Sequence, residues 1–418
     1  MRERGEPWPA HAARSRVGGA TLCQDPRVRV LVAPDVVGAS LPAPVAAAAI
    51  RDGWTRTAPS DDVRVCPLSD GGSGFVAAVH ASTGGELLSC TVRSPWGTGV
   101  PAAVLLTETG GRRTAYVEAA HATGPALVGR AGSPGTATSA GVGDLLAVAR
   151  DAGATRVVVG VGPAVAYDAG AGMLAALGVG AGPDGVLGSG AGRLGDVVEG
   201  DLVGLRELRA VWAGVDLVAA CASDLPLLGL HGASASAAAH GDVPADRAQA
   251  MERSVAHLAH LAGAALGADP VRRDLLAPRS ATTGRTAALP GAGAGGGLGF
   301  GLALLGARLL PGAAVVADVV DLAARVADVD LAVTATGDLD PTVLHGSVVT
   351  TVADAAMHAA VPTVVIAGQV LVGRRELAAA GVTAAYPVRE PGDDAAWSAD
   401  PGGALARRAE RVARTWSA

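Results

Sequence analysis

The chain contains 418 residues, of which 50% are hydrophobic and 17% are charged, and its formal net charge is -6. A chain of this length and apolar content exceeds one ordinary domain and can bury large cores, which excludes extensive intrinsic disorder. The acidic balance excludes a general nucleic-acid binder, because no basic surface is present to neutralise phosphates.

Neither a membrane span nor a disulfide-linked secreted fold is expected. The longest uncharged stretch, "TAALPGAGAGGGLGFGLALLGA", is interrupted by Pro290 and many glycines. The four cysteines are scattered without a CxxC pair, which disfavours a zinc site or a disulfide framework. Residues 1–27 form a loose extension that lacks a continuous apolar segment, so no signal peptide is predicted. We expect a cytoplasmic protein.

The order of strand and helix patterns predicts an α/β protein. Strand-like runs occur at residues 28–33, 63–66, 102–107, 114–118, 156–161, 215–220, 331–334 and 363–367. Helical patterns occur at residues 42–56, 74–82, 141–152, 170–177, 245–265, 297–310, 316–327 and 348–360. This alternation is typical of largely parallel sheets. Residues 91–118 instead predict a strand-rich meander, so we expect two dissimilar α/β domains.

The first two loops of the chain carry carboxylates. A buried strand at residues 28–33 runs into a loop with Asp35 and Ser40, and an alanine-rich helix follows. In "PLSDGGSGF" (residues 67–75), Asp70 and three glycines lead into another helix. Backbone N–H groups of such glycines can approach a phosphate or carboxylate at a helix N-terminus. A helix-capping turn, with Asp70 or the following serine as the N-cap, explains the same residues.

Two further glycine-rich loops can each be interpreted either as part of a ligand site or as a structural feature. In "VVVGVGPAVAYDAGAGML" (residues 157–174), Asp168 follows a buried strand and either binds Mg²⁺, accepts a proton or caps a helix. The tract "LPGAGAGGGLGFGLALLGA" contains GxGxxG at residues 291–296, but a nicotinamide-binding fingerprint needs a strand immediately before it. A glycine platform over the phosphates of a ligand is favoured, with close helix packing as the alternative.

The stretch "DLAVTATGDLDPTVLHGSVV" runs from a strand into Thr336, Asp338, Asp340 and His345. Open α/β sheets bind ligands at the carboxyl ends of their strands. An Asx-type turn explains the two aspartates without the histidine. The chain has no GxxxxGK[ST] loop, no GxSxG elbow and no HExxH helix, which excludes the enzyme classes built on those motifs.

These stretches, in this order, resemble the bacterial glycerate kinase family, which phosphorylates glycerate from ATP. "DVVGASL" (residues 35–41) resembles the family's D-S-x-K-G-S-L, and "PLSDGGSGF" resembles P-x-A-D-G-G-E-G-T. "VEAAHATGPAL", "GVGDLLAVARDAG", "GVGPAVAYDAGAGM" and "CASDLPLLGLHGAS" are similar to further blocks in register. "PGAGAGGGLGFGLALL" and "TATGDLDPTVLHGS" resemble P-G-A-G-A-A-G-G-x-G and T-G-E-G-R-I-D…H-G-K. The resemblance covers about residues 28–388, nearly the whole chain.

The resemblance implies a discontinuous flavodoxin-like domain with a parallel sheet (residues 28–66 and 290–418) and an inserted mixed α/β domain (residues 67–289). It implies ATP and Mg²⁺ as cofactors, and a small hydroxy acid and a nucleotide as partners. The implied catalytic residues are Asp70, Asp168 and Asp340, with Asp70 and Asp168 also binding the metal. The implied substrate-binding residues are Asp35, Ser40, Thr336 and His345. The implied nucleotide-binding residues are Gly71, Gly72, Gly74, Gly291, Gly293, Gly295, Gly296 and Gly297.

The chain departs from the family pattern at its cationic and polar positions. The family lysine of the first loop falls at Gly38. In the last motif the family glutamate, arginine and lysine fall at Thr336, Asp338 and Ser347. Other polar family residues are replaced at Ser73, Ala164, Tyr167, Ala222 and Leu225, and a family glycine is replaced at Pro163. The chain contains no lysine, so all 33 Lys+Arg positions are arginine.

Phosphoryl transfer depends on positive charge around the moving phosphoryl group. Mg²⁺ or a displaced arginine (Arg51, Arg279 or Arg285) would have to replace the lost cations. Three functions follow: an ATP-dependent glycerate kinase-type transferase, a catalytically inactive homologue that binds ligands or regulates, and a phosphotransferase with an altered substrate. The lost cations favour the inactive homologue. The surviving aspartates favour the kinase, because clustered carboxylates repel one another without a cation or metal.

Overall fold

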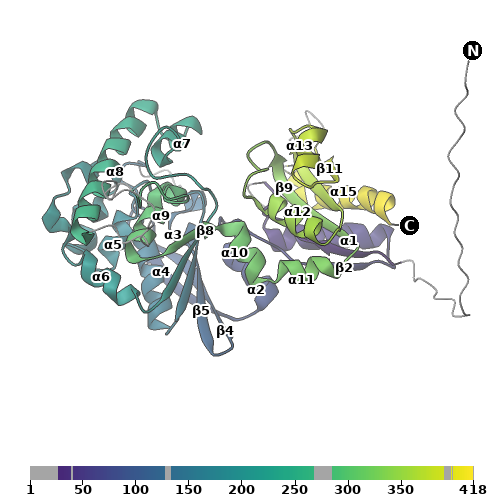
Figure 1. Cartoon of the computed structure of the whole chain (residues 1–418), viewed down its shortest axis with the longest axis horizontal. Coiled ribbons are helices and arrows are strands. Elements are labelled where there is room, and N and C mark those ends of the chain that lie inside the picture. Colours follow the sequence, from purple (N-terminus) through teal and green to yellow (C-terminus); the bar gives the residue numbers. More distant parts are fainter. Residues whose placement is uncertain are drawn as a thin grey trace, which may run out of the picture.

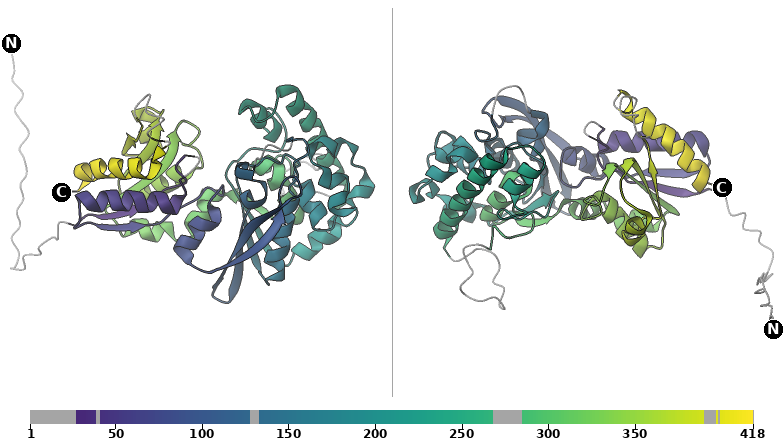
Figure 2. Two further views of the ribbon diagram at one scale, coloured as in Figure 1. Left: turned by 180° about the vertical axis from the view of Figure 1, so that it is seen from behind. Right: turned by 90° about the horizontal axis from the view of Figure 1, so that it is seen from above.

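The computed structural model describes residues 27–38, 41–127, 133–267, 285–389, 397 and 399–417. The chain forms two α/β lobes, each built around its own sheet, as predicted. The lobes lie side by side along the long axis of the molecule (Figures 1 and 2), with the first lobe in purple, light green and yellow and the second mostly in teal. None of the described helices is long and apolar enough to cross a membrane.

The first lobe contains a five-stranded parallel sheet. Its spatial order is β11-β10-β9-β1-β2, with bounds β1 (Arg29–Val32), β2 (Asp62–Val65), β9 (Leu331–Leu339), β10 (Thr363–Val370) and β11 (Ala384–Pro387). Numbered within the lobe, this is the order 2-1-3-4-5 of flavodoxin-like folds. The strand order reverses between β1 and β9, where Val30 pairs with Leu331 and Val32 with Val333. Ligands bind at such a switch point in open α/β sheets.

Helices cover both faces of this sheet. On one face α1 (Ala43–Thr57) and α15 (Pro401–Trp416) bury Ile50, Trp54 and Leu405 against alternate residues of the strands. On the other face lie α10 (Gly312–Val319), α11 (Leu322–Ala327), α12 (Val348–His358) and α13 (Arg374–Ala379). With both faces covered, the strands are almost continuously apolar, which explains why their hydrophobic runs were readable in the sequence.

The second lobe contains a six-stranded mixed sheet in sequential order. Its strands are β3 (Glu86–Arg93), β4 (Gly99–Thr109), β5 (Arg112–Glu118), β6 (Arg156–Val161), β7 (Asp216–Cys221) and β8 (Arg308–Pro311). The first three form the predicted meander with antiparallel pairing, and β5 to β8 are parallel. The carboxyl ends of β6 and β7 therefore meet at one edge of this sheet.

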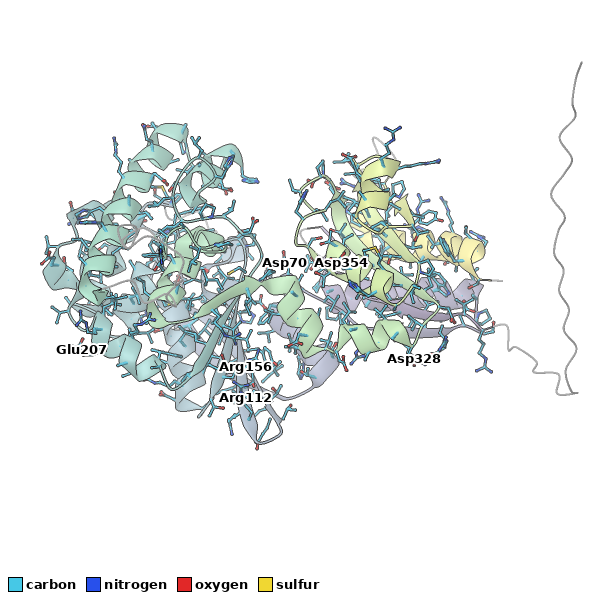
Figure 3. The ribbon with its side chains drawn as sticks, in the orientation of Figure 1. Asp70, Arg112, Arg156, Glu207, Asp328 and Asp354 are labelled. Atoms are coloured by element: carbon cyan, nitrogen blue, oxygen red, sulfur yellow. The ribbon has the colours of Figure 1, made fainter. Side chains whose placement is uncertain are left out.

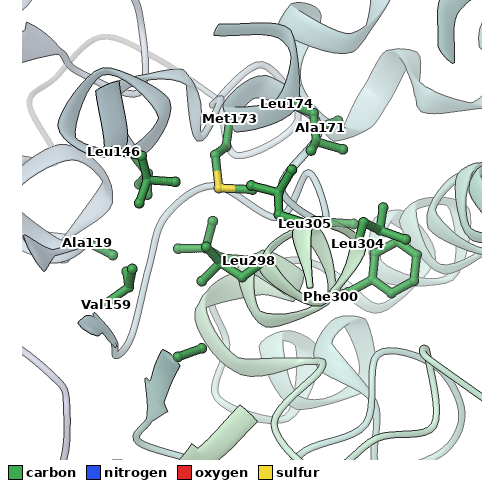
Figure 4. Packing of buried hydrophobic residues seen from close by; sticks show 14 of the residues in the cluster. Ala119, Leu146, Val159, Ala171, Met173, Leu174, Leu298, Phe300, Leu304 and Leu305 are labelled. Carbon is green, nitrogen blue, oxygen red and sulfur yellow. The ribbon is translucent and has the colours of Figure 1, made fainter. Parts of the chain in front are cut away.

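The main core of the second lobe lies on one face of its sheet. The helices of the lobe are α2 (Phe75–Thr83), α3 (Ala120–Thr123), α4 (Ala140–Asp151), α5 (Ala171–Ala176), α6 (Leu205–Trp212), α7 (Ala233–Ala239), α8 (Ala245–Leu266) and α9 (Ala294–Leu305). Short 3₁₀ turns occur at Pro125–Leu127, Gly182–Asp184, Val186–Ser189, Ala191–Asp196 and Glu199–Leu202. The buried side chains of Met173 in α5, Leu298 and Phe300 in α9 and Val159 in β6 belong to one core cluster (Figure 4).

A second core joins the two lobes. Phe75 and Val79 of α2 and Val316 of α10 pack against Val158 of β6, on the face opposite the main core. The same cluster continues into the first lobe through Leu31 of β1. The lobes are thus connected by packed side chains as well as by the chain.

The return to the first lobe occurs later in the chain than expected. We expected residues from 290 onward in the flavodoxin-like lobe, but α9 packs in the second lobe and β8 pairs with β7. The crossing therefore follows Pro311. Residues 308–311, expected as the end of a helix, are an edge strand, and the helix expected at 316–327 is divided into α10 and α11.

Candidate active site

The switch point of the first sheet holds Asp35. The backbone N–H of Asp35 donates to the carbonyl of Ala335 in β9 (3.0 Å), so the loop after β1 is tied to the neighbouring strand. Gly337 lies so close to this loop that a Cβ there would be 3.1 Å from the Gly38 nitrogen. The predicted substrate residue Asp35 thus lies where open α/β sheets place ligands.

Asp70 lies at the corresponding edge of the second sheet. A Cβ at the adjacent Gly71 would be 2.2 Å from the carbonyl oxygen of Ala220 in β7, and a Cβ at Gly162, after β6, would be 2.4 Å from Gly72. These contacts explain why glycines follow Asp70. Figure 3 shows Asp70 where the two lobes meet.

Asp35 and Asp70 interact with each other. The chain after β2 runs beside the loop after β1, with the Leu68 N–H donating to the carbonyl of Pro34 (2.9 Å). Burial, and after it the charge of Asp70, raises the pKa of Asp35 well above its usual value. Burial also raises the pKa of Asp70, although the Gly72 N–H donates to its carboxylate (2.7 Å). The structure therefore brings two of the four predicted aspartates together.

The expected phosphate cradle at the start of α2 is corrected by the structure. The N–H groups of Gly71 and Gly72 donate to the side chains of Ser69 (3.1 Å) and Asp70 (2.7 Å). Glu118, which is 4% exposed, accepts from the N–H of Gly74 (2.8 Å) and also from the N–H of Val76 (3.1 Å). A protein carboxylate thus accepts from these two amides at the start of α2. The N-cap is Gly74, not Asp70 or Ser73 as the capping alternative expected.

Asp168 lies apart from this pair. Its side chain is 1% exposed and accepts hydrogen bonds from the N–H groups of Gly170 (3.1 Å) and Gly172 (3.0 Å). It also accepts from both the N–H (2.8 Å) and the hydroxyl (3.0 Å) of Ser139. Four donors satisfy both of its oxygens. Through these bonds Asp168 joins the starts of α4 and α5, and its expected catalytic and metal-binding roles stay predictions.

The other predicted residues of the last motif form a local turn. Asp340 accepts from the N–H (2.8 Å) and hydroxyl (2.6 Å) of Thr342, and these bonds, the hydroxyl bond first, hold its pKa below the usual range. His345 is exposed and bonds through Nδ1 to the carbonyl of Pro341 (2.9 Å). Thr336 is buried within β9. The Asx-turn interpretation therefore holds for Asp340. Ser40 lies outside the described residues.

A cavity of about 680 Å³ adjoins Asp70 in the second lobe. Its wall includes Trp96, Tyr167, Gly293, Gly295 and Gly296, and Asp242 lies on it as well. The Tyr167 hydroxyl donates to Asp242 (3.0 Å). Burial, and after it the charge of Asp242, raises the pKa of Tyr167, so the phenol stays neutral and can donate. Arginine is absent from the described residues that line this cavity.

The glycine tract at the start of α9 packs against other parts of the lobe in addition to lining the cavity. Gly295, Gly296 and Gly297 have φ values of 61°, 66° and 89°. A Cβ at Gly296 would be 2.0 Å from the carbonyl oxygen of Ala166. The tract therefore packs against the loop after β6, while Gly293, Gly295 and Gly296 face the cavity. Gly291 and Gly297 are not among the described residues that line it.

One arginine at the edge of the first sheet was not predicted. Arg389 follows β11, and its Nη2 donates to the carboxylate of Asp338. Its guanidinium lies 6.0 Å from the centre of the Trp397 ring. The strand-like "TAAYPV" before it was the available signal, but that short run was not assigned as a strand. Of the arginines that were considered, Arg51 pairs with Asp52 and Arg279 lies outside the described residues. Arg285 is described but is not among the residues that line the cavity.

The described residues contain no group of three or more His, Cys, Asp or Glu side chains that could hold a metal ion. The Asp35–Asp70 pair places two carboxylates close together where the lobes meet. Mg²⁺ sites commonly use one or two carboxylates together with substrate phosphates, and this pair fits that pattern.

Comparisons with known proteins agree with the fold and the order of the loops. The sequence signature described as "Glycerate kinase family" matches residues 30–417. Glycerate kinase of Bacillus subtilis (strain 168) is 34% identical over 348 residues, which cover 82% of this chain and 85% of that protein. Uncharacterized protein MT2261 of Mycobacterium tuberculosis is 39% identical over 377 residues, covering 89% and 87%.

A solved structure shows the same architecture. It is a Salmonella typhimurium LT2 crystal structure provisionally described as glycerate kinase 2, with a TM-score of 0.71 and 30% sequence identity. The similarity covers 93% of this chain and 98% of that chain. Matches of this extent span both lobes and the connections between them, and the chain belongs to the glycerate kinase family.

Proposed function

We propose that the protein transfers the γ-phosphoryl group of ATP to a hydroxyl group of glycerate or a related small hydroxy acid. The observation that carries this proposal is the interaction of Asp35 and Asp70, one from the edge of each sheet, beside a cavity. Family membership supplies the reaction class. The two carboxylates supply groups that can hold a cation and accept a proton.

The nucleotide would bind in the cavity of the second lobe. Its volume of about 680 Å³ lies within the range of small-molecule sites. The aromatic side chains of Trp96 and Tyr167 offer surfaces against which a base can pack, and the glycines of the wall allow close approach of phosphates. Asp70 lies on the same wall, so a triphosphate directed toward it would end at the junction of the lobes.

Mg²⁺ would be held by Asp70 together with the phosphates of the nucleotide. Burial raises the pKa of both carboxyl groups, and the charge of Asp70 raises that of Asp35 further, so a nearby cation would favour their charged forms. When bound, the ion would supply part of the positive charge that the lost family cations provided. Asp168 has no place in this set, because its oxygens are already satisfied.

Asp35 is the better candidate for the base that accepts the hydroxyl proton. It lies on the side of the first lobe, while Asp70 faces the cavity. Burial and the charge of Asp70 raise the pKa of Asp35, which brings a carboxylate closer to the range in which general bases work. Each carboxylate then has one role: Asp70 faces the nucleotide and Asp35 faces the acceptor.

The second candidate function is a catalytically inactive homologue that binds ligands. The observation that favours it is the cavity wall, whose described residues include carboxylates but no arginine. A phosphotransferase with another small hydroxy acid as its substrate is a variant of the first proposal.

The test is an assay of ADP release with D-glycerate, ATP and Mg²⁺, using the whole chain. We expect turnover in the wild type and a loss of about 10²- to 10⁴-fold in Asp70→Asn. Asp340→Asn is the matched control, because this aspartate serves a surface turn, and it should retain activity within about threefold. An absence of turnover with any small hydroxy acid, combined with a thermal shift on adding ATP, would establish the inactive homologue instead.

A further inference from the structure

We propose that Asp242 binds the ribose hydroxyl groups of the nucleotide and makes the cavity of the second lobe selective for ribonucleotides. This inference rests on the proposed function, because it names the part of the nucleotide that this side of the cavity recognises. Neither the sequence motifs nor the family resemblance assigned a role to Asp242.

Asp242 and Asp70 lie on different parts of the cavity wall. Asp242 lies between α7 and α8 and also lines a second cavity, of about 340 Å³, which shares Pro134 with the first. Asp70 is not among the described residues of this second cavity and lies instead where the lobes meet (Figure 3). A carboxylate without a metal repels phosphates. With the phosphates directed toward Asp70, Asp242 faces the sugar and the base.

The carboxylate of Asp242 is held in place before any ligand binds. Its backbone N–H donates to the carbonyl of Ala237 in α7 (2.9 Å). The hydroxyl of Tyr167 donates to its Oδ2 (3.0 Å). Tyr167 in turn packs against a small core that includes Ala237 and Val243, so the donor is itself fixed.

The other oxygen of this carboxylate, Oδ1, is open to a ligand. Asp242 is exposed, and no donor to Oδ1 occurs among the hydrogen bonds of the described residues. An ionised carboxylate has about four acceptor positions on its two oxygens, and the Tyr167 hydroxyl uses one of them. This side chain can therefore only accept, and the ligand must supply the donors.

Among the parts of ATP, the ribose matches a carboxylate best. Its two neighbouring hydroxyl groups are a pair of donors, and carboxylates bind a ribose hydroxyl in dinucleotide-binding folds. The amino group of adenine is also a donor, but a ring nitrogen that only accepts lies beside it and would face the carboxylate. The acceptor character of Asp242 thus favours the sugar over the adenine base.

The aromatic wall places the sugar on the same side. Tyr167 lines the cavity, and its hydroxyl contacts Asp242. A base that packs against the Tyr167 ring has its ribose one bond away, which brings the hydroxyl groups toward the carboxylate at the end of that ring. The stacking surface and the acceptor therefore act on neighbouring parts of one ligand.

The experiment measures the affinity of the whole protein for ADP, 2′-deoxyADP and 3′-deoxyADP by calorimetric titration with Mg²⁺ present. The wild type should bind ADP about 10- to 100-fold more tightly than the deoxy nucleotides, the range for a lost hydrogen bond to a charged group. Asp242→Ala should abolish this preference. Asp242→Asn removes the charge but keeps an acceptor oxygen, so its preference should fall to about 2- to 10-fold.

Asp246→Ala is the matched control. Asp246 is an exposed aspartate in the first turn of α8 and is not among the described residues that line either cavity. Its replacement makes the same change of charge near the site and should leave the preference for ADP unchanged. Asp242→Asn also keeps the comparison possible if Asp242→Ala fails to fold.

Two results overturn the inference: equal binding of ADP and both deoxy nucleotides by the wild type, or an unchanged preference in a folded Asp242→Ala. A preference for GDP over ADP that is lost in Asp242→Ala also overturns it, because it would place the base at this carboxylate. Turnover of ATP and 2′-deoxyATP with equal kcat/KM contradicts this inference and leaves the kinase proposal intact. A ribose preference without turnover contradicts the kinase proposal alone.

Discussion

Asp35 and Asp70 lie close together where the edges of two different sheets meet, and burial raises the pKa of both carboxyl groups. Burial, followed by the charge of Asp70, raises the pKa of Asp35. Two such carboxylates are stable neighbours when they share a proton or a cation. This relationship leads to the first two predictions.

Asp35→Asn should change how stability depends on pH. The raised pKa means that native Asp35 holds its proton above the ordinary value of 3.8, while the unfolded chain loses it there. The wild-type free energy of unfolding therefore falls as pH rises through this window, and the variant lacks that loss. Urea unfolding at several values from about pH 4 to pH 8 should show the variant gaining stability relative to the wild type. A stability difference between wild type and variant that is constant across this range would contradict the raised pKa of native Asp35.

Mg²⁺ with ADP should stabilise the wild type more than ADP alone. A ligand at about 100 times its Kd adds about 2.7 kcal/mol to the free energy of unfolding. Asp70→Asn should lose the part that depends on Mg²⁺, whereas Asp340→Asn should retain it. Thermal unfolding with and without the metal measures this difference. Equal metal-dependent shifts in both variants would place the ion elsewhere.

Glu118→Ala should destabilise the protein by about 2 to 4 kcal/mol, because it leaves two amide donors at the start of α2 without their carboxylate. Glu108→Ala, at an exposed position of β4, should cost less than about 0.5 kcal/mol. Urea denaturation of the two variants provides the comparison. Similar small losses in both would show that the Glu118 carboxylate is dispensable for capping.

Asp168→Asn should reduce stability without weakening the response to Mg²⁺. The amide would turn an NH₂ group toward donors that now share two carboxylate oxygens, at a cost of about 2 to 4 kcal/mol. Activity per folded molecule and the Mg²⁺ concentration for half-maximal activity should stay close to wild type. A large increase in that Mg²⁺ concentration would return Asp168 to the metal site.

Tyr167 should contribute to nucleotide binding through its ring. Loss of base stacking in Tyr167→Ala should raise the KM for ATP about 10-fold, with kcat less affected. Tyr167→Phe keeps the ring and removes only the hydrogen bond to Asp242, so its KM should stay within about threefold of wild type. Steady-state kinetics with ATP as the varied substrate distinguishes the two. Equal effects in both variants would indicate that the hydroxyl, not the ring, is what matters.

The regular parts of the fold were predictable because they depend on local pattern. The runs that became β1, β6, β7, β9 and β10 are buried on both faces, so they are apolar throughout and stand out from their surroundings. The edge strands β8 and β11 are only four residues long and half exposed, and their short apolar runs were not assigned as strands. The boundary of the inserted lobe was misplaced for the same reason, since it depends on the pairing of β8 with β7.

The candidate site was predictable only as a set of aspartates. The four aspartates look alike in sequence, because each lies in a loop that follows a strand-like run. Their hydrogen-bond partners differ: Asp168 accepts from four donors, and Asp340 accepts from Thr342 in its own turn. Glu118 lies 44 residues from the glycine whose amide it accepts, so no local motif reveals that it occupies the anion site of α2.

The sequence by itself determined the α/β class, the family and the glycine positions, because these follow from short-range pattern and from motifs in a constant order. Tertiary structure alone decided which carboxylates face each other, which amides are already occupied and which arginine reaches the edge of the first sheet. Asp35 and Asp70, or Asp338 and Arg389, come together through strand pairing and lobe packing, and the properties of charged groups depend on their neighbours in space.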